Sequence, residues 1–94
     1  MLNERIKSLR KAHGLNQVEL ARALGVTKQS ISNWENDNIL PSIEMLMKIS
    51  RYFSVSADYL LGLDERRCID ASKLSDQQIY HIQQLVNDLQ KSNA

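Results

Sequence analysis

Four of the five polar side chains between positions 28 and 33 are expected to point outward, with groups that can hydrogen-bond to base edges in double-stranded DNA. They are Lys28, Gln29, Ser32 and Asn33. In the major groove a lysine can donate to guanine O6 and N7, and asparagine or glutamine can make paired hydrogen bonds to adenine N6 and N7. The same residue types also form ordinary solvated helix faces. The elements that position these side chains therefore decide between the two interpretations.

The segment around these residues has the signals of a helix, a tight turn and a second helix. Asn16 is a good N-cap and Glu19 follows three residues later, so the pair can form a capping box at a helix start. Gly25 tolerates the left-handed conformation in which many helices end. Thr27 is the next N-cap candidate, which predicts a second helix over about residues 28–35.

Apolar and small residues lie at the spacing that two crossing helices need. The seven positions are Leu20, Ala21, Leu24, Gly25, Val26, Ile31 and Trp34. Ala21 is small where a crossing helix must come close, and Val26 can fill the gap between the helices. Ile31 and Trp34, three residues apart, would face the core and turn the polar side chains outward. Seven matching positions are far more specific than a short motif, so the pattern favours a DNA-reading helix-turn-helix.

With these residues the chain resembles the lambdoid phage repressor and Cro-type helix-turn-helix family. The run LNQVELARALGV at 15–26 is similar to the family's positioning helix, and TKQSISNWEN at 27–36 is similar to its recognition helix. The stretches PSIEMLMKIS and VSADYLLG resemble its fourth and fifth helices, so the likeness covers roughly residues 2–62. The resemblance implies an all-α fold with a five-helix, lambda-repressor-like DNA-binding domain.

The resemblance also implies roles for individual side chains. Base contacts are expected from Lys28, Gln29 and Asn33. Phosphate contacts are expected from Asn16, Gln17, Ser30 and Asn36. Structural roles are expected for Ala21, Gly25, Ile31 and Trp34, and Arg10 is expected to pair with Glu35.

Two positions depart from the family pattern. Asp37 and Ser54 stand where family members often have glycine, each just past a predicted helix. Aspartate tolerates a left-handed turn better than most residues, so we expect the fold to survive at Asp37. Its charge would lie near a region that faces phosphates. The hypothesis is that Asp37 weakens DNA binding.

Three further helices are expected within the first 62 residues. One covers about 2–13 and stops at Gly14, one begins after the N-cap Ser42, and a short one begins after Ser56 and ends at Gly62. The short helix would include Tyr59, Leu60 and Leu61. The residues expected to pack in the core from the other two helices are Leu2, Ile6, Leu9, Ile43, Met45, Leu46, Met47, Ile49 and Phe53.

Length and composition fit one small helical domain followed by a tail. The 94 residues are 43% hydrophobic, which is enough for a single compact core. No apolar run is long enough to cross a membrane, and charges stand where a signal peptide needs its apolar core, so a cytoplasmic protein without a membrane partner is expected. The single cysteine, Cys68, allows no internal disulfide and is interpreted as a bystander, with a redox-sensing thiol as the alternative.

The net charge is small for a nucleic-acid binder. Residues 1–62 hold eight Lys and Arg against six Asp and Glu, and residues 63–94 hold four against five. Binding to DNA would therefore rest on the local placement of Arg10, Arg22 and Lys28 and on helix N-termini aimed at phosphates. No metal or other cofactor is expected, because His13 has no second ligand at a metal-binding spacing.

The last third of the chain has its own pattern. Residues 63–73 are charged and without periodicity, which indicates a linker. Residues 74–94 hold an amphipathic helix, expected over about residues 76–90, with a capping box at its start. Its apolar seam consists of Ile79, Ile82, Val86 and Leu89, with Leu85 widening it. Two heptads are too few to establish a coiled coil from pattern alone. The seam could serve homodimerisation, bind a protein antagonist or toxin, or fold back on the same chain.

These patterns predict a sequence-specific DNA-binding transcriptional regulator, and the resemblance favours a repressor. A homodimer would place two recognition helices on an inverted repeat with half-sites about one helical turn apart. One alternative is an antitoxin that represses its own promoter and binds a toxin through the tail. Another is a protein-interaction module without DNA binding. An enzyme is the least supported class, since no nucleophile constellation or nucleotide loop is present.

Overall fold

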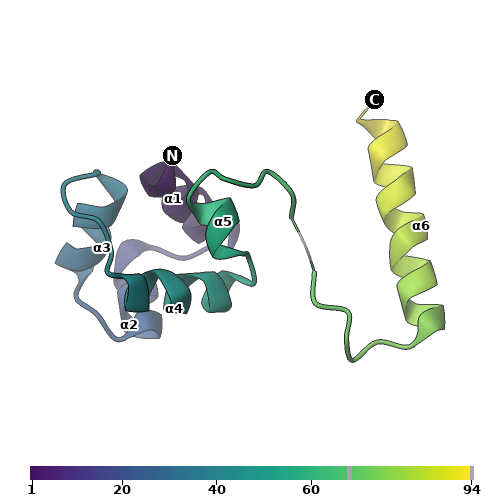
Figure 1. Ribbon diagram of the computed structural model, residues 1–94, viewed down its shortest axis with the longest axis horizontal. Helices are drawn as coiled ribbons and strands as arrows, with labels where there is room; N and C mark the ends of the chain where they lie inside the picture. The colour runs from purple at the N-terminus through teal and green to yellow at the C-terminus, as the bar shows by residue number, and fades with distance from the viewer. Residues whose placement is uncertain (68, 94) are drawn as a thin grey trace.

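The computed structural model describes residues 1–67 and 69–93 of the chain. Over these residues the regular structure is helical: α1 Leu2–Ala12, α2 Gln17–Leu24, α3 Lys28–Glu35, α4 Ile43–Phe53, α5 Ala57–Leu60 and α6 Asp76–Ser92. Helices α1–α5 gather in one cluster, and α6 stands apart from it at the end of an extended segment (Figure 1). The predicted all-α fold of five helices and an extra C-terminal helix is confirmed.

Helix boundaries follow the local capping signals. The Asn16 side chain accepts a hydrogen bond from the Glu19 amide at 2.8 Å, and the Glu19 carboxylate accepts one from the Asn16 amide at 2.9 Å, so the predicted capping box is present. Thr27, Ser42 and Ser56 each cap the following helix through a side-chain oxygen. The differences are small: α1 ends one residue before the predicted 2–13 boundary, and α6 continues two residues beyond Gln90.

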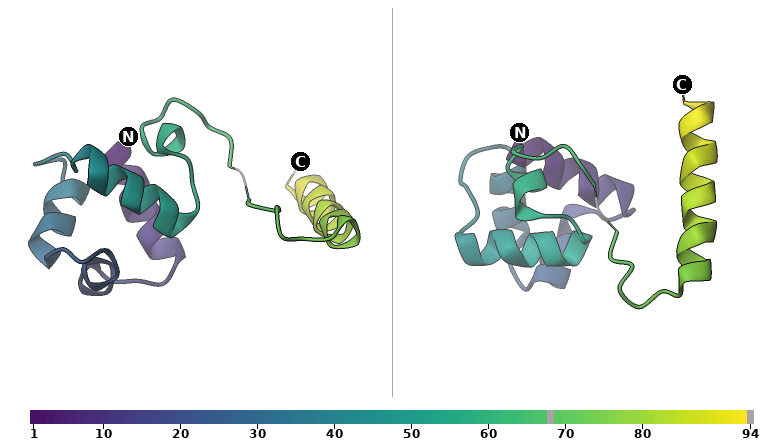
Figure 2. Two further views of the ribbon diagram at one scale, coloured as in Figure 1. Left: turned by 60° about the horizontal axis from the view of Figure 1, so that its bottom comes forward. Right: turned by 45° about the vertical axis from the view of Figure 1, so that its right-hand side comes forward.

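The core lies within the α1–α5 cluster, which we call the head. Ten buried residues form it: Ile6, Leu9, Leu20, Ala21, Leu24, Ile31, Trp34, Ile49, Phe53 and Leu60. Both views in Figure 2 show the five helices wrapped around a common centre with α6 outside it. Burial of this apolar surface is the main force that fixes α2 and α3 against each other.

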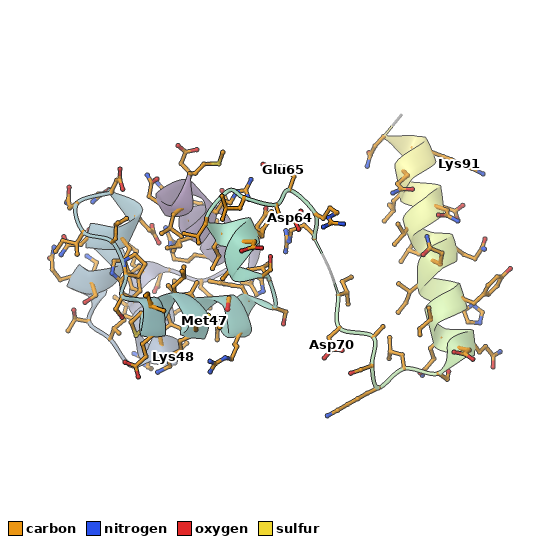
Figure 3. The ribbon with its side chains drawn as sticks, in the orientation of Figure 1. Met47, Lys48, Asp64, Glu65, Asp70 and Lys91 are labelled. Atoms are coloured by element: carbon orange, nitrogen blue, oxygen red, sulfur yellow. The ribbon has the colours of Figure 1, made fainter. Side chains whose placement is uncertain are left out.

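Two residues predicted to be core are exposed. The exposed fraction is 81% for Ile43 and 41% for Met47. Ile43 is the first residue of α4, and Met47, labelled in Figure 3, lies about one turn further along the same helix. The core-facing side of α4 instead carries Ile49 and Phe53. The short helix was predicted to include Leu61, but α5 ends at Leu60 and Leu61 is its C-cap.

The turn between α2 and α3 sets the orientation of α3. Gly25 has φ 71° and ψ 33°, the left-handed conformation expected at that position. The Val26 amide donates to the Ala21 carbonyl at 2.9 Å, which satisfies a carbonyl left open at the end of α2. Val26 then packs against the core between the two helices. The predicted helix-turn-helix geometry is therefore present.

Candidate nucleic-acid interface

The outer face of α3 carries the predicted base-contacting side chains. Lys28 and Gln29 are exposed and Asn33 is partly buried. Gln29 Nε2 donates to Asn33 Oδ1 at 3.1 Å, one turn further along the helix. The two amide side chains therefore form a connected pair that leaves Gln29 Oε1 to accept and Asn33 Nδ2 to donate, which is the group pattern that reads adenine N6 and N7.

The opposite face of α3 explains why these side chains point outward. Ile31 is 0% exposed and Trp34 is 7% exposed, so the helix is held on the core through positions three residues apart. The N-cap of the helix is Thr27, whose side-chain oxygen accepts from the Ser30 amide at 3.1 Å. Its last turn is closed by the Asn38 amide, which donates to the Asn33 carbonyl at 2.9 Å. The orientation of α3 is therefore fixed along its length.

The four predicted phosphate ligands are distributed around the start of α2 and the ends of α3. Asn16 is the N-cap of α2, and its Oδ1 is used by the cap, so its Nδ2 is the group that could donate to a phosphate. Ser30 Oγ lies 3.0 Å from Thr27 Oγ1, and Asn36 Nδ2 donates to Ser32 Oγ at 3.2 Å.

Gln17 has an unexpected partner. Its Nε2 donates to Glu35 Oε1 at 3.2 Å, which links the first residue of α2 to the last residue of α3. The sequence pattern did not indicate this contact because the two residues lie 18 positions apart. The bond fixes the Gln17 side chain at the surface predicted to face phosphates.

The same glutamate holds a buried ion pair. Arg10 Nε donates to Glu35 Oε2 at 2.7 Å and Arg10 Nη2 donates to Oε1 at 3.0 Å, a bidentate arrangement. Arg10 Nη1 also donates to the Leu15 carbonyl at 2.8 Å. Hydrogen bonding to Glu35 raises the pKa of Arg10 above its ordinary value, although burial acts in the opposite direction. The pair that the family resemblance implied is thus a junction between α1 and α3.

This burial corrects the expected role of Arg10 in charge placement. The Arg10 side chain is 10% exposed and engaged with Glu35, so it is not a surface cation that DNA could reach. Lys28 and Arg22 are both exposed. The positive charge available near α2 and α3 is therefore smaller than the sequence count suggested.

Both positions that depart from the family pattern adopt left-handed backbone conformations. Asp37 has φ 60° and Ser54 has φ 55°. The chain therefore keeps the turns that glycine would form, at the cost of backbone strain for residues with a Cβ. Asp37 is exposed two residues after α3 ends, so its carboxylate is a surface charge just past the C-terminal end of that helix.

The start of the predicted linker is attached to the head. Arg5 of α1 donates to the Tyr59 carbonyl and, through Nη2, to Glu65 at 2.8 Å. Its guanidinium lies 4.1 Å from the centre of the Tyr59 ring, and that of Arg67 lies 4.9 Å away. These cation–π contacts were not indicated by the sequence, since an arginine at position 5 has no local signal for a tyrosine at 59.

The predicted seam residues lie on one side of α6. Ile79 and Ile82 are each 39% exposed, Leu89 is 54% exposed, and Val86 is partly buried. No residue of α6 is buried. Its start has the predicted capping box: Ser75 Oγ accepts from the Gln78 amide at 3.1 Å, and Gln78 Oε1 accepts from the Ser75 amide at 2.9 Å.

Residues 1–67 and 69–93 contain no group of three His, Cys, Asp or Glu side chains placed to hold a metal ion. His13 Nδ1 lies 2.9 Å from the Leu9 carbonyl, and its ring packs edge-on against Phe53. Over the same residues, no helix has the length and apolar character needed to span a membrane. The interpretation of Cys68 concerns a residue outside those the structure describes.

Comparison with known proteins agrees with this geometry. The sequence matches the helix-turn-helix family over residues 6–60. It is 40% identical over 65 residues to the antitoxin PezA of Streptococcus pneumoniae (serotype 4, strain ATCC BAA-334 / TIGR4), which covers 69% of this chain and 41% of PezA. The chain spans about half the length, or less, of the first curated relatives that it matches.

Two solved structures resemble the fold. The P22 c2 repressor protein, solved in complex with a synthetic operator, superposes with a TM-score of 0.64 at 36% identity, covering 68% of this chain and 97% of that one. A chain from a complex of the SinR and SinI proteins gives a TM-score of 0.62 at 30% identity, covering 98% of this chain and 99% of that one. By sequence and by structure, the chain belongs to the helix-turn-helix family.

Proposed function

We propose that this chain is a sequence-specific regulator of transcription, and that it represses by occupying an operator that overlaps a promoter. The observation that carries the proposal is the outward row of Lys28, Gln29 and Asn33 on α3, in a helix-turn-helix whose core fixes that face toward solvent. These side chains would read bases in the major groove, inside the cytoplasm where the DNA lies.

Phosphate contacts would hold the head in register while α3 reads the bases. The proposed ligands are Asn16, Gln17, Ser30 and Asn36. Two features support this division of labour: Gln17 is already oriented by Glu35, and the start of α2 offers backbone amides to an anion. The P22 c2 repressor, whose fold is similar, was solved with an operator bound.

A homodimer would be the operator-binding form. One recognition helix reads only a few base pairs, and two heads related by a two-fold axis would read an inverted repeat with twice the sequence information. The surface proposed for pairing is the seam of α6, formed by Ile79, Ile82, Val86 and Leu89.

The test is selection of bound duplexes from a random DNA pool, with the mass of the full chain in solution measured in parallel. We expect an enriched inverted repeat and a dimer mass for the native chain. The variant Ile82→Asp should lose the dimer mass and bind the repeat more weakly, whereas Tyr80→Asp, on another side of the same helix and 61% exposed, should behave as the native chain does. No enrichment at low salt would reject DNA reading and leave a protein-interaction module.

A second candidate function assigns the tail to a different protein. The similarity to the antitoxin PezA, and to a chain from the complex of SinR and SinI over nearly the whole of this sequence, favours considering it. In this version the head still binds DNA and the α6 seam binds a toxin or an antagonist. Co-expression with the product of an adjacent small gene would test it: co-purification lost in Ile82→Asp and kept in Tyr80→Asp supports this candidate.

A further inference from the structure

We propose that α6 pairs with α6 of a second copy in antiparallel orientation, with the two-fold axis near position 84. This inference rests on the proposed dimeric function and adds the geometry of the pairing. It starts from an exposed apolar face: in Figures 1 and 2, α6 stands apart from the head, and Leu85 and Leu89 are 59% and 54% exposed. A face of this kind on a helix with no buried residue indicates that a partner covers it.

The seam reads the same in both directions. Its four residues follow one another at spacings of three, four and three, so the pattern is symmetric about position 84. In an antiparallel pair, Ile79 would lie opposite Leu89 of the second copy, and Ile82 opposite Val86 of the second copy. All four positions would then be filled on both helices without a shift in register.

Leu85 distinguishes antiparallel from parallel pairing. It flanks the seam on one side, and residues on that side meet the same side of the partner only when the helices run in opposite directions. Because Leu85 is one residue from the two-fold axis at position 84, it would pack on Leu85 of the second copy in an antiparallel pair. In a parallel pair the same leucine would face Gln90 of the second copy, an amide side chain. The antiparallel arrangement buries more apolar surface.

The helix dipoles favour the same orientation. Asp76 lies in the first turn of α6, and Lys91 lies in the last turn, where Figure 3 shows it near the C-terminus. Lys91 is on the outer side that also carries Gln77 and Gln84, so its charge does not face the second copy. In an antiparallel pair the helix dipoles oppose each other, whereas a parallel pair would bring like ends together. The positions flanking the seam, Gln83 and Gln90 among them, carry no charge that would select the parallel form.

Antiparallel pairing also separates the two heads by a distance close to that between two operator half-sites. Each linker joins the N-terminal end of α6, and these ends would lie at opposite ends of the pair. For 17 residues rising about 1.5 Å each, the separation is about 25 Å. In a parallel pair the ends would be only about 10 Å apart, the usual distance between packed helix axes. Half-sites one helical turn apart are separated by about 34 Å, which is closer to the antiparallel spacing.

Spin-label distances in the full chain would test the orientation. Gln77 and Gln84 are exposed and lie two turns apart on the side of α6 away from the seam, so a label at either leaves the pairing surface intact. Each would be labelled as Gln77→Cys or Gln84→Cys in a chain with Cys68→Ser, and the distance between copies measured by pulsed electron resonance. Antiparallel helices offset the two labels at position 77 by about 21 Å along the axis, since 14 residues separate their levels, whereas labels at position 84 are level.

The expected result is therefore a clearly longer distance for position 77 than for position 84. If the distance between copies is the same for labels at positions 77 and 84, in a chain that still dimerises and binds the selected operator, antiparallel pairing is overturned. The proposed function would still stand. A monomer mass at the labelling concentration would overturn the pairing itself. A longer distance at position 77 in a chain that selects no DNA would support the pairing while rejecting the proposed function.

Discussion

Arg10 of α1 and Glu35 of α3 form a bidentate ion pair at 2.7 and 3.0 Å inside the head, and Gln17 of α2 donates to the same carboxylate at 3.2 Å. Glu35 is 6% exposed, so this carboxylate joins three helices in a largely dry environment. Through Gln17, this carboxylate contacts the surface proposed to face DNA. It connects the stability of the head with the position of Gln17.

Replacing Glu35 with glutamine should destabilise the head by about 3–5 kcal/mol, because it leaves the buried Arg10 charge without its counter-ion. Urea unfolding followed by circular dichroism would measure the loss. The pKa of Arg10 is raised in the folded state, so the stabilisation from its charge is present at all pH values below its unfolded pKa and is lost only in strong alkali. No change in the effect is expected between pH 5 and pH 8.

The matched control replaces both partners with an apolar residue of similar length. Arg10→Met combined with Glu35→Met removes the pair without leaving a buried charge, so we expect most of the lost stability to return. A double variant as unstable as Glu35→Gln alone would mean that the glutamate contributes through its contact with Gln17 instead.

Replacing Lys28 with alanine should lower operator affinity by about 1–3 kcal/mol and relax preference at one base pair, if the lysine reads a guanine. The measurement is titration of the native and Lys28→Ala chains against the operator and against duplexes changed at single positions. An equal loss on every duplex would instead assign Lys28 to a phosphate.

Replacing Asp37 with glycine should tighten operator binding, because it removes an exposed negative charge beside α3. The expected gain is about 0.2–1 kcal/mol, the range measured for exposed charges. Asp37→Asn removes the charge but keeps a residue that tolerates the φ of 60°. Both variants should therefore bind more tightly in fluorescence anisotropy titrations, and unchanged or weaker binding in both would contradict the hypothesis.

Ser54→Gly separates the backbone effect from the charge effect. Ser54 has a similar φ of 55° but carries no charge and lies after α4, away from α3. The substitution should stabilise the head by about 1 kcal/mol through relief of the left-handed conformation, and operator affinity should stay the same.

Replacing Lys48 with methionine should cost about 1 kcal/mol of stability. Lys48 Nζ donates to the Leu24 carbonyl at 2.7 Å, so this α4 side chain satisfies an open carbonyl at the end of α2. Thermal unfolding would measure the change. Lys7→Met, an exposed lysine on α1, is the control and should leave the midpoint nearly unchanged.

The sequence by itself determined the helices and the turn between α2 and α3. Capping by Asn16, Thr27 and Ser42 and the left-handed Gly25 depend on residues within a few positions of each other, so their signals are readable without the fold. The outward direction of Lys28 follows from the same local periodicity. Its expected contact with a base came from family resemblance and stays a prediction.

Only the tertiary structure decided which side chains meet across the head. Gln17 reaches Glu35 across 18 positions, and Arg5 reaches Glu65 across 60, distances over which local patterns carry no information. The exposure of Ile43 was likewise decided by where the core ends, since an amphipathic helix can extend past the surface it packs on. Which side chains are buried, and which form hydrogen bonds or ion pairs, depends on how separate helices pack together. The sequence pattern of one helix determines only which of its faces is apolar.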